Sequence, residues 1–393
     1  MSTRLYSRNA VLLAKIETTE GTDSLPVGGT DAVLVSDLSI TPLAGDTVDL
    51  AYVRPYFGAS PSLRTREYVE VQFTVDIAGS AAAGTAAPWG ALLRGCGFAQ
   101  TLLGAAVTGT AAAGTTSSVT LAAGSSSTDG VYVGATISMT SGSASGQSSI
   151  ITAYNGTTKV ATLGKPLSVA AGTGGYSIAP NASYAPISTG FESLTLYHNV
   201  NGVRHKLLGA RGSVSFTINA NERPTMQFSF TALQGGIADA SEASPVYTSW
   251  QTPVAVSGTN TQAMLAGKFT NDTTSAASFQ LQSFSLDMAN AITHRQVIGL
   301  ENVVLTNRAP AGNVSIEATT VTFKNWWNDV RSITTNPFYI QHGTAAGNTF
   351  CLFAPAAQLT DPSYSDSDGI VMLGMGIRAL PSAGNDDVRI IVK

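Results

Sequence analysis

A strand followed by one short helix is predicted twice along the chain. In the first occurrence, apolar and polar residues alternate over residues 69–77, which is typical of a half-buried strand. A glycine- and alanine-rich loop follows it. Apolar residues then recur with the spacing i, i+3, i+4, i+7 at Trp89, Leu92, Leu93 and Cys96. That spacing predicts one apolar stripe on a short helix.

The second occurrence has the same elements in the same order. Apolar residues alternate with polar ones at Val314, Ile316 and Ala318, and the helical spacing returns at Phe323, Trp326, Trp327 and Val330. This repetition predicts a duplicated unit. Duplication commonly serves symmetry, and symmetry serves assembly.

Further alternating strands follow each helix. They are expected near residues 194–200, 214–218 and 226–230 in the first unit, and near 338–340, 350–352, 371–377 and 388–390 in the second. The closing segments are also alike, since Phe-Thr-Ala-Leu at 230–233 matches Ile-Arg-Ala-Leu at 377–380. The expected fold class is therefore mostly β, with two tandem β-sandwich or barrel units, each carrying one short helix.

A segment of low charge interrupts the first unit. Between Arg94 and Glu192 the charged residues are Asp129, Lys159 and Lys165, and short β-type runs are separated by turn signals such as Asn155-Gly156. We interpret residues 104–180 as a small inserted all-β module, with a disordered low-complexity loop as the alternative. The predicted domains are then an N-terminal arm (1–30), a discontinuous first domain (31–103 and 181–240), the insert, and a second domain (241–393). The arm is expected to be partly disordered or ordered by packing on a neighbour.

Composition narrows the classes of function. Charged residues make up 12% of the 393 residues, against about 25% in typical globular chains. Other copies of the chain covering much of the surface would explain this, although a Gly/Ser/Thr-rich adhesin would look similar. A net charge of −4 argues against a protein that grips nucleic acid through basic patches. Two distant cysteines, no signal peptide and no membrane span predict synthesis in a reducing cytoplasm.

No catalytic, cofactor-binding or metal-binding residues are predicted. The best metal-like cluster is Asp361, Asp366 and Asp368, but a calcium loop would need an acid where Tyr364 stands, so capping of a turn is favoured. Trp326-Trp327 is assigned to core packing rather than to a sugar-binding platform. Aromatic residues beside an arginine are common interface anchors, and the predicted interface residues are Arg4, Arg8, Tyr52, Arg54, Tyr56, Phe57, Arg64 and Arg66.

Several short segments stand in a characteristic order along the chain; they include Arg54-Pro55-Tyr56-Phe57-Gly58, Ala86-Ala87-Pro88-Trp89-Gly90, Leu208-Gly209-Ala210-Arg211-Gly212, Asp287-Met288-Ala289-Asn290 and Asp366-Ser367-Asp368-Gly369-Ile370. Taken together, these segments resemble the major tail tube proteins of long-tailed (siphovirus-like) bacteriophages. The resemblance covers most of residues 31–100 and 190–393, and the insert resembles a small β module that decorates phage structural proteins.

The resemblance implies a structural tube subunit whose stacked rings surround a channel for phage DNA. It implies contacts with further copies of the chain and with tape-measure, tail-terminator and tail-tip proteins, and a place in the virion tail after assembly in the host cytoplasm. It implies no enzyme activity, no cofactor and no membrane partner.

Because two units are present, we predict trimeric rings with pseudo-sixfold symmetry, with single-domain hexamers carrying an unrelated outer domain as the alternative. The arm and residues 41–66 are the candidates for contacts between rings. The alternative function is a carbohydrate-binding or adhesive tail or capsid decoration protein, and a glycan hydrolase is a more distant one.

Overall fold

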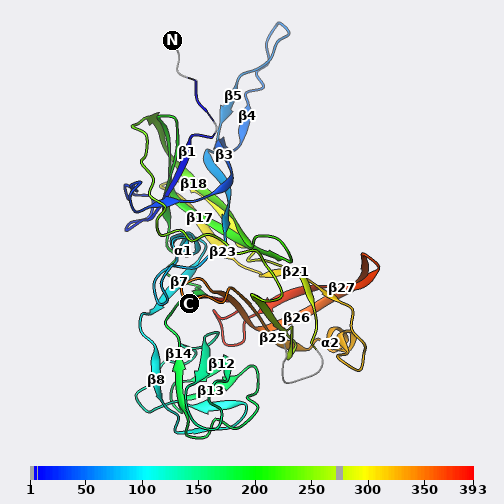
Figure 1. The fold of residues 1–393 in the computed structure, drawn as a ribbon. Coiled ribbons are helices and arrows are strands. Elements are labelled where there is room, and N and C mark those ends of the chain that lie inside the picture. The colour runs from blue at the N-terminus through cyan, green and yellow to red at the C-terminus, as the bar shows by residue number, and fades with distance from the viewer. Residues whose placement is uncertain (1–3, 7, 271–277) are drawn as a thin grey trace.

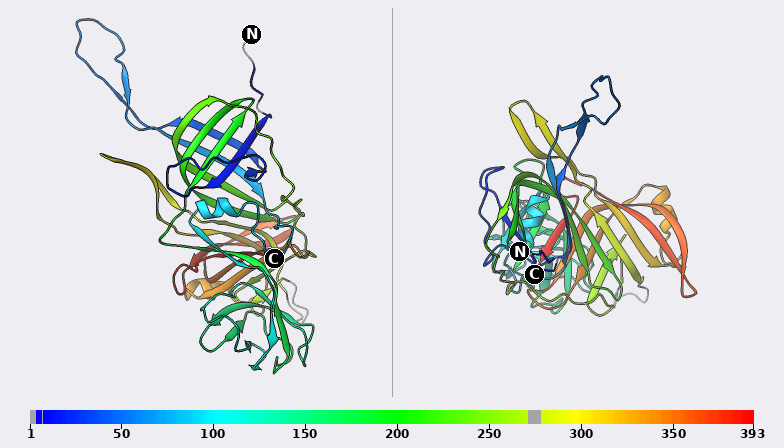
Figure 2. Two further views of the ribbon diagram at one scale, coloured as in Figure 1. Left: turned by 90° about the vertical axis from the view of Figure 1, so that its left-hand side faces the viewer. Right: turned by 90° about the horizontal axis from the view of Figure 1, so that it is seen from above.

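The computed structural model describes residues 4–6, 8–270 and 278–393, which form 28 strands and two six-residue helices. Three parts follow one another along an elongated molecule (Figures 1 and 2): a first β unit, a second β unit, and a small β module beyond it. A predominantly β fold with short helices was predicted from the sequence, and the structure confirms it.

The first unit is a highly twisted antiparallel sheet with the strand order β2–β1–β16–β17–β18–β6–β3. Alternation along β6 and β18 directs large apolar side chains to one face, where the Phe73 ring stacks on Phe228 and Phe230 at centroid distances of 5.6 and 5.9 Å. The strands are β1 (Ala10–Ile16), β2 (Ala32–Val33), β3 (Ser36–Ala44), β6 (Tyr68–Asp76), β16 (Leu194–Val200), β17 (Val203–Asn219) and β18 (Thr225–Asp239).

The second unit has the strand order β20–β19–β25–β26–β27–β24–β21. Its strands are β19 (Thr261–Leu265), β20 (Lys268–Phe269), β21 (Leu281–Asp287), β24 (Ala311–Glu317), β25 (Thr335–His342), β26 (Phe350–Ser367) and β27 (Ile370–Leu380).

These two orders are topologically the same. Reading each from its far edge, β3, β6, β18, β17, β16, β1 and β2 correspond to β21, β24, β27, β26, β25, β19 and β20, and every neighbouring pair is antiparallel in both. A hairpin interrupts both units at the same place: β4 (Thr47–Asp49) and β5 (Ser62–Arg64) lie between β3 and β6, and β22 (Ala291–Val297) and β23 (Leu300–Asn307) lie between β21 and β24. The strand pairing of the second unit thus repeats that of the first.

The two units share one continuous sheet. The C-terminal half of β17, from Ser215 to Asn219, pairs with β21 of the second unit. Eight strands therefore run side by side in the order β3–β6–β18–β17–β21–β24–β27–β26. We refer to this arrangement as the eight-stranded sheet.

One short helix packs against each unit. In α1 (Gly90–Gly95), preceded by Trp89, the predicted stripe is buried, and the Trp89 indole donates to the Ala78 carbonyl at 2.9 Å. Its ring also approaches Phe350 of the second unit, with centroids 6.3 Å apart. In α2 (Trp326–Arg331), Asn325 caps the first turn and Trp326 is buried, while Trp327 is half-buried beside Tyr364.

Three strands extend the sheet in a way that the sequence pattern did not predict. β7 (Phe98–Leu103) pairs with β15 (Asn181–Pro186), β15 pairs with β28 (Arg389–Val392), and β28 pairs with β26. Residues 98–103 and 181–186, which the sequence analysis assigns to the first domain, therefore join the sheet of the second unit. Alternation reports that a strand is half-buried but does not identify its partner.

The insert is a seven-stranded sheet with its own core (Figure 1). It docks on the second unit, where the Arg389 guanidinium donates to the carbonyl oxygens of Gly130 and Val133 at 2.6 and 3.2 Å. Its strands are β8 (Val107–Thr110), β9 (Ala113–Gly114), β10 (Ser118–Thr120), β11 (Thr136–Met139), β12 (Ser148–Asn155), β13 (Val160–Leu163) and β14 (Gly175–Ile178).

The N-terminal segment differs from the expected arm. Residues 10–16 form β1, which pairs with β16 of the same chain and buries Leu12 and Leu13. Glu17, which follows it, accepts hydrogen bonds from the hydroxyl groups of Ser193 and Thr195 and from the backbone amides of Gly21 and Gly209. The segment is thus anchored by its own chain, because the buried residues Leu12, Leu13 and Ala14 and a carboxylate with four hydrogen bonds offset the cost of ordering it.

Candidate assembly and lumen surfaces

One face of the eight-stranded sheet is almost entirely small and polar. The opposite face carries Phe73, Phe216, Phe228, Phe284 and Ile316, all buried in the main core. Alternation places serine, threonine, glutamine, asparagine and glycine on the open face of every strand. The residues on that face include Ser39, Thr41, Gln72, Thr74, Ser213, Ser215, Thr217, Gln227, Ser229, Ser283, Ser285, Asn313, Ser315, Ser363, Ser365, Gly374 and Gly376.

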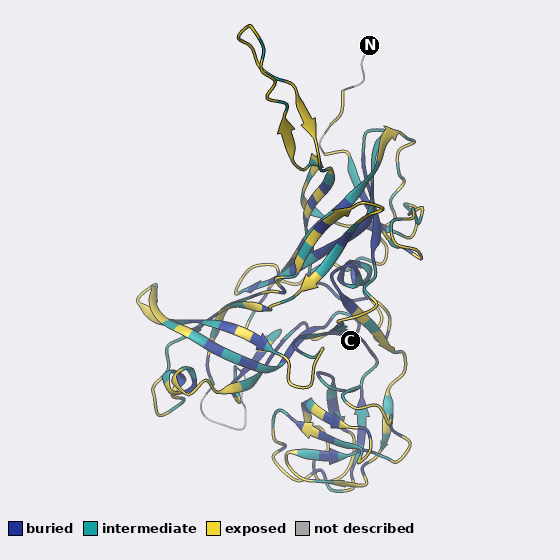
Figure 3. Cartoon of the chain, turned by 180° about the vertical axis from the view of Figure 1, so that it is seen from behind, coloured by how far each residue is buried: buried dark blue, intermediate teal, exposed yellow. Residues whose placement is uncertain are grey.

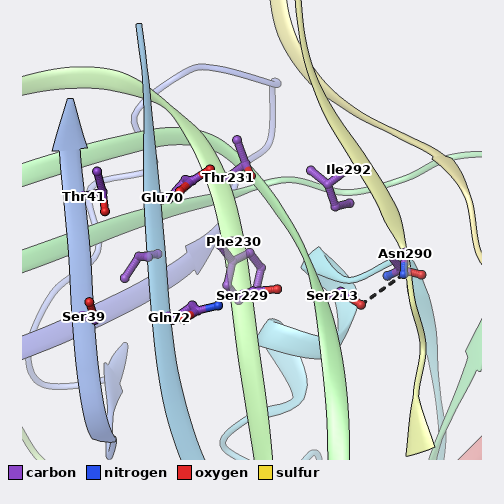
Figure 4. Close-up of a pocket in the computed structure, with 11 residues that line it drawn as sticks. Ser39, Thr41, Glu70, Gln72, Ser213, Ser229, Phe230, Thr231, Asn290 and Ile292 are labelled. Atoms are coloured by element: carbon purple, nitrogen blue, oxygen red, sulfur yellow. Dashed lines mark hydrogen bonds between the residues drawn. The ribbon is translucent and has the colours of Figure 1, made fainter. Parts of the chain in front are cut away.

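Charge on this polar face is sparse and mildly acidic. The strand pairings place the acidic residues Glu70, Asp76, Asp287 and Glu317 and the basic residue Arg378 on it. A shallow groove of about 350 Å³ crosses it between β3 and the start of the second unit's hairpin (Figure 4). The backbone N–H of Asn290 donates to the Ser213 hydroxyl at 3.1 Å there. Hydroxyl groups and amides without a cluster of cations make a surface that does not hold phosphate strongly.

The hairpin of the first unit, residues 45–66, projects away from the body (Figures 1 and 3). Its tip carries four predicted interface residues. Tyr52, Tyr56 and Phe57 are exposed, Phe57 fully so, and the Arg54 guanidinium lies 5.9 and 6.0 Å from the ring centroids of the two tyrosines. Exposed aromatic side chains beside an arginine are suited to an interface that is absent from a single copy.

The other four predicted residues lie elsewhere. Arg64 donates to the Leu43 carbonyl at 3.2 Å at the base of the same hairpin. Arg66 pairs with Asp46 at 3.3 Å and donates to the His294 carbonyl at 2.9 Å. Arg4 and Arg8 are exposed in the segment that precedes β1. A role for any of the eight in subunit contacts stays a prediction.

Sequence reasoning missed the hairpin of the second unit. Alternation over residues 291–307 around Gly299 was the signal that would have revealed it. Unlike the first hairpin, it folds back along the first unit: Val303 is buried, the His294 ring stacks on Tyr68 at 5.2 Å, and Arg211 donates to the Val303 carbonyl. Its tip is exposed at Ile298.

Groups that could carry chemistry are dispersed in the described part of the chain. No set of three or more His, Cys, Asp or Glu side chains is arranged there to hold a metal ion. Burial raises the pKa of the Cys96 and Cys351 thiols, which lowers their nucleophilicity. Asp366 accepts from the Gly369 amide at 3.3 Å, so it caps the turn between β26 and β27. None of the described helices is long and apolar enough to cross a membrane.

Comparison with known proteins supplies the family. No curated protein matches the chain. The family model described as "Phage tail tube protein", however, matches residues 7–379, which is nearly the whole length and includes both β units and the insert. A structural subunit with a mostly β fold and a large polar face is consistent with that family, which is not a class of enzymes. The chain belongs to the phage tail tube protein family and is a structural component of a phage tail.

Proposed function

We propose that three copies of this chain form a ring with pseudo-sixfold symmetry, and that the rings stack into a tail tube through which double-stranded DNA passes. The observation that carries the proposal is the repeated strand order of the two units within one continuous sheet. Two equivalent units in each of three copies give six equivalent positions around a ring.

The dimensions of such a ring suit a DNA channel. Three copies of an eight-stranded sheet supply 24 strands, since 3 × 8 = 24. At a strand spacing of about 4.8 Å, a closed ring of them has a backbone diameter of roughly 37 Å if the strands follow the axis, and of about 48 Å at a tilt of 40°. Such a ring is wider than a DNA duplex once side chains are added.

The polar face is the surface proposed to line this channel. DNA must slide along the tube, so contacts with phosphate have to be weak and independent of sequence. Binding to phosphate strengthens with each cation that a protein presents, whereas this face presents hydroxyl groups, amides and a few carboxylates. Mild repulsion then keeps the duplex away from the wall.

Contacts between rings are assigned to the tips of the two hairpins, because a tip can stay exposed while the strands behind it pack on a β unit, as Ile298 does beyond the buried Val303. Each hairpin carries fully exposed apolar residues at its tip, Val53 and Phe57 in the first and Ile298 in the second. A trimeric ring would thus present six apolar tips to the next ring. The same proposal assigns the tape-measure, terminator and tail-tip proteins as partners, and the host cytoplasm as the place of assembly.

Electron microscopy of the purified chain over a concentration series tests this function. Tubes or rings with a central channel are expected, with threefold averages that are close to sixfold in the inner wall. Rings of six copies would favour the hexameric alternative. Particles that stay monomeric at high concentration would refute the tube, and binding of these particles to a glycan array would favour the adhesive function instead.

A further inference from the structure

The junction between the two units shows one way in which two units of this fold join edge to edge. In this junction Ser215–Asn219 of β17 pairs with Ser283–Asp287 of β21, with Thr217 facing Ser285. Phe216 is completely buried at this pairing, where it faces Leu286. The hairpin of the second unit also folds over the first unit at this junction and buries Val303.

Both halves of this junction recur at the ends of the eight-stranded sheet, where they are unpaired. β3 corresponds to β21, and within the described residues only β6 pairs with it. The segment of β26 from Ser363 to Ser367 corresponds to Ser215–Asn219, and in the same described region it pairs only with β27. The eight-stranded sheet of one copy therefore has two outer strand edges. Each of them matches one of the two edges that are joined at the inner junction.

Side-chain exposure indicates that these edges are incomplete in a single copy. Phe230 and Ile377 occupy matching positions in β18 and β27. Phe216 faces Met226, four positions before Phe230, and Tyr364 faces Leu373, four positions before Ile377, so Tyr364 corresponds to Phe216. Phe216 is 0% exposed, whereas Tyr364 is 62% exposed. The hairpins differ in the same way, since Val303 is 0% exposed and Leu63 in β5 is 57% exposed. An unpaired strand edge that carries an exposed aromatic side chain favours pairing with another chain.

We infer that the ring closes through a contact between chains that repeats the inner junction. In this contact Ser363–Ser367 of β26 pairs antiparallel with β3 of the next copy of the chain. The strands of that copy's 45–66 hairpin fold over the second unit beside β26 and β27. The inference rests on the proposed ring and specifies the partner edges within it. The occupant is a second copy of this chain, because the complementary edge and the complementary hairpin both belong to it. The contact is heterologous, as closure of a cyclic ring requires.

The inner junction also fixes the register of the outer one. Thr217 faces Thr225, five positions before Phe230, and Ser365 faces Met372, five positions before Ile377. On the other strand, Ser285 faces Asn313 and Ser39 faces Gln72.

Since Thr217 faces Ser285 within the chain, Ser365 is predicted to face Ser39 of the next copy, and Ser363 to face Thr41. These serines and Thr41 are exposed in one copy.

Disulfide cross-linking tests the register. The double variants S39C/S365C and T41C/S363C place cysteines on predicted facing positions, where Cβ atoms lie about 4.5–5.5 Å apart and small adjustments permit a disulfide. The matched control T41C/S367C is displaced by four residues, or roughly 13 Å. Cys96 and Cys351 are buried and stay in place.

Assembled rings are oxidised and separated on denaturing, non-reducing gels. Covalent trimers are expected from both facing pairs, with a yield on the order of tenfold above the displaced control. Rings of normal symmetry that cross-link no better than the control would overturn this inference and leave the proposed function standing. Failure of the unmodified chain to form rings would overturn both.

A second variant covers the case in which the cysteine pairs do not assemble. Tyr364→Asp places a charge on the bare edge, at a side chain that is mostly exposed in one copy, so the subunit is expected to fold normally by circular dichroism. It is expected to abolish rings, while Val169→Asp, at an exposed apolar position in the insert, is expected to form them. Rings from Tyr364→Asp at the parent concentration would contradict the assignment of this edge.

Discussion

Replacing Arg211 with alanine is expected to detach the second unit's hairpin from the first unit. The Arg211 side chain is 7% exposed and forms a bidentate ion pair with Glu20, with both contacts at 2.8 Å. The same guanidinium donates to the carbonyl oxygens of Phe191 and Glu192 at 3.3 Å and to that of Val303. One side chain therefore holds three segments of the chain together.

The expected loss in the free energy of unfolding depends on which groups each substitution leaves without a partner. Removing a buried partner from a charged network costs about 3–5 kcal/mol, and Arg211→Ala also leaves three carbonyl groups without this donor. Glu20 is 38% exposed, so in Glu20→Gln the amide can turn to water and the arginine keeps its three carbonyl partners. A loss of about 1 kcal/mol is expected there. The two variants should therefore differ by about 2–4 kcal/mol.

The assay combines guanidinium denaturation of the unassembled subunit with hydrogen exchange. Arg211→Ala should lower the free energy of unfolding by the larger amount and speed exchange in residues 291–307 selectively, whereas Glu20→Gln should leave the exchange of that hairpin near the parent rate. Equal losses in the two variants would refute the reasoning, because the ion pair alone would then account for the effect. An unchanged hairpin in Arg211→Ala would refute it as well.

Three further predictions concern stability and docking. Burial, followed by the charge of His205, lowers the pKa of His198 to about 4, so the contribution of His198 to stability should be complete above pH 6.5 and fall by up to about 3 kcal/mol between pH 6.5 and 4. A flat denaturation midpoint over that range would contradict this. His198→Gln should reduce the dependence without abolishing it, because burial also lowers the pKa values of His205 and His342. Gly79→Ala should lower the melting temperature more than Asn348→Ala does. A Cβ at Gly79 would lie 2.0 Å from the Gly347 carbonyl oxygen, whereas Asn348→Ala removes one hydrogen bond of 2.7 Å. Equal melting temperatures would count against this contact between the units. Gly134→Ala, with its Cβ 2.3 Å from Ile391 and a φ of +81°, should increase proteolysis of the insert without preventing tube assembly, and unchanged digestion would show that the docking tolerates the methyl group.

Periodicity in the sequence was sufficient to predict the repeated elements. The stripe around Trp89 is buried, and in the stripe around Trp326 that residue is buried while its neighbours are half-buried against the core, because helical spacing reports which side of a helix packs inward. Which strands pair with one another was harder to predict from the sequence. From the sequence, β1 is part of an N-terminal arm, and β7 and β15 belong to the first unit, because the strand edges that they join lie far away in sequence. Domain boundaries drawn from the sequence therefore stay a prediction, although the strand order within each unit is explicit in the structure.

The polar face of the eight-stranded sheet could not be predicted either, because it also depends on strand pairing. Each strand of the eight-stranded sheet reads separately as a half-buried strand, and its serines and threonines read as an ordinary solvent face. Only the pairing of β17 with β21 aligns eight such faces and makes a wall of low charge from them. Only then can the buried Phe216 and the exposed Tyr364 be compared as equivalent positions of the two units. Two equivalent positions, one covered inside the chain and one bare at its edge, are the pattern expected when a duplicated protein still needs further copies of itself to complete the sheet.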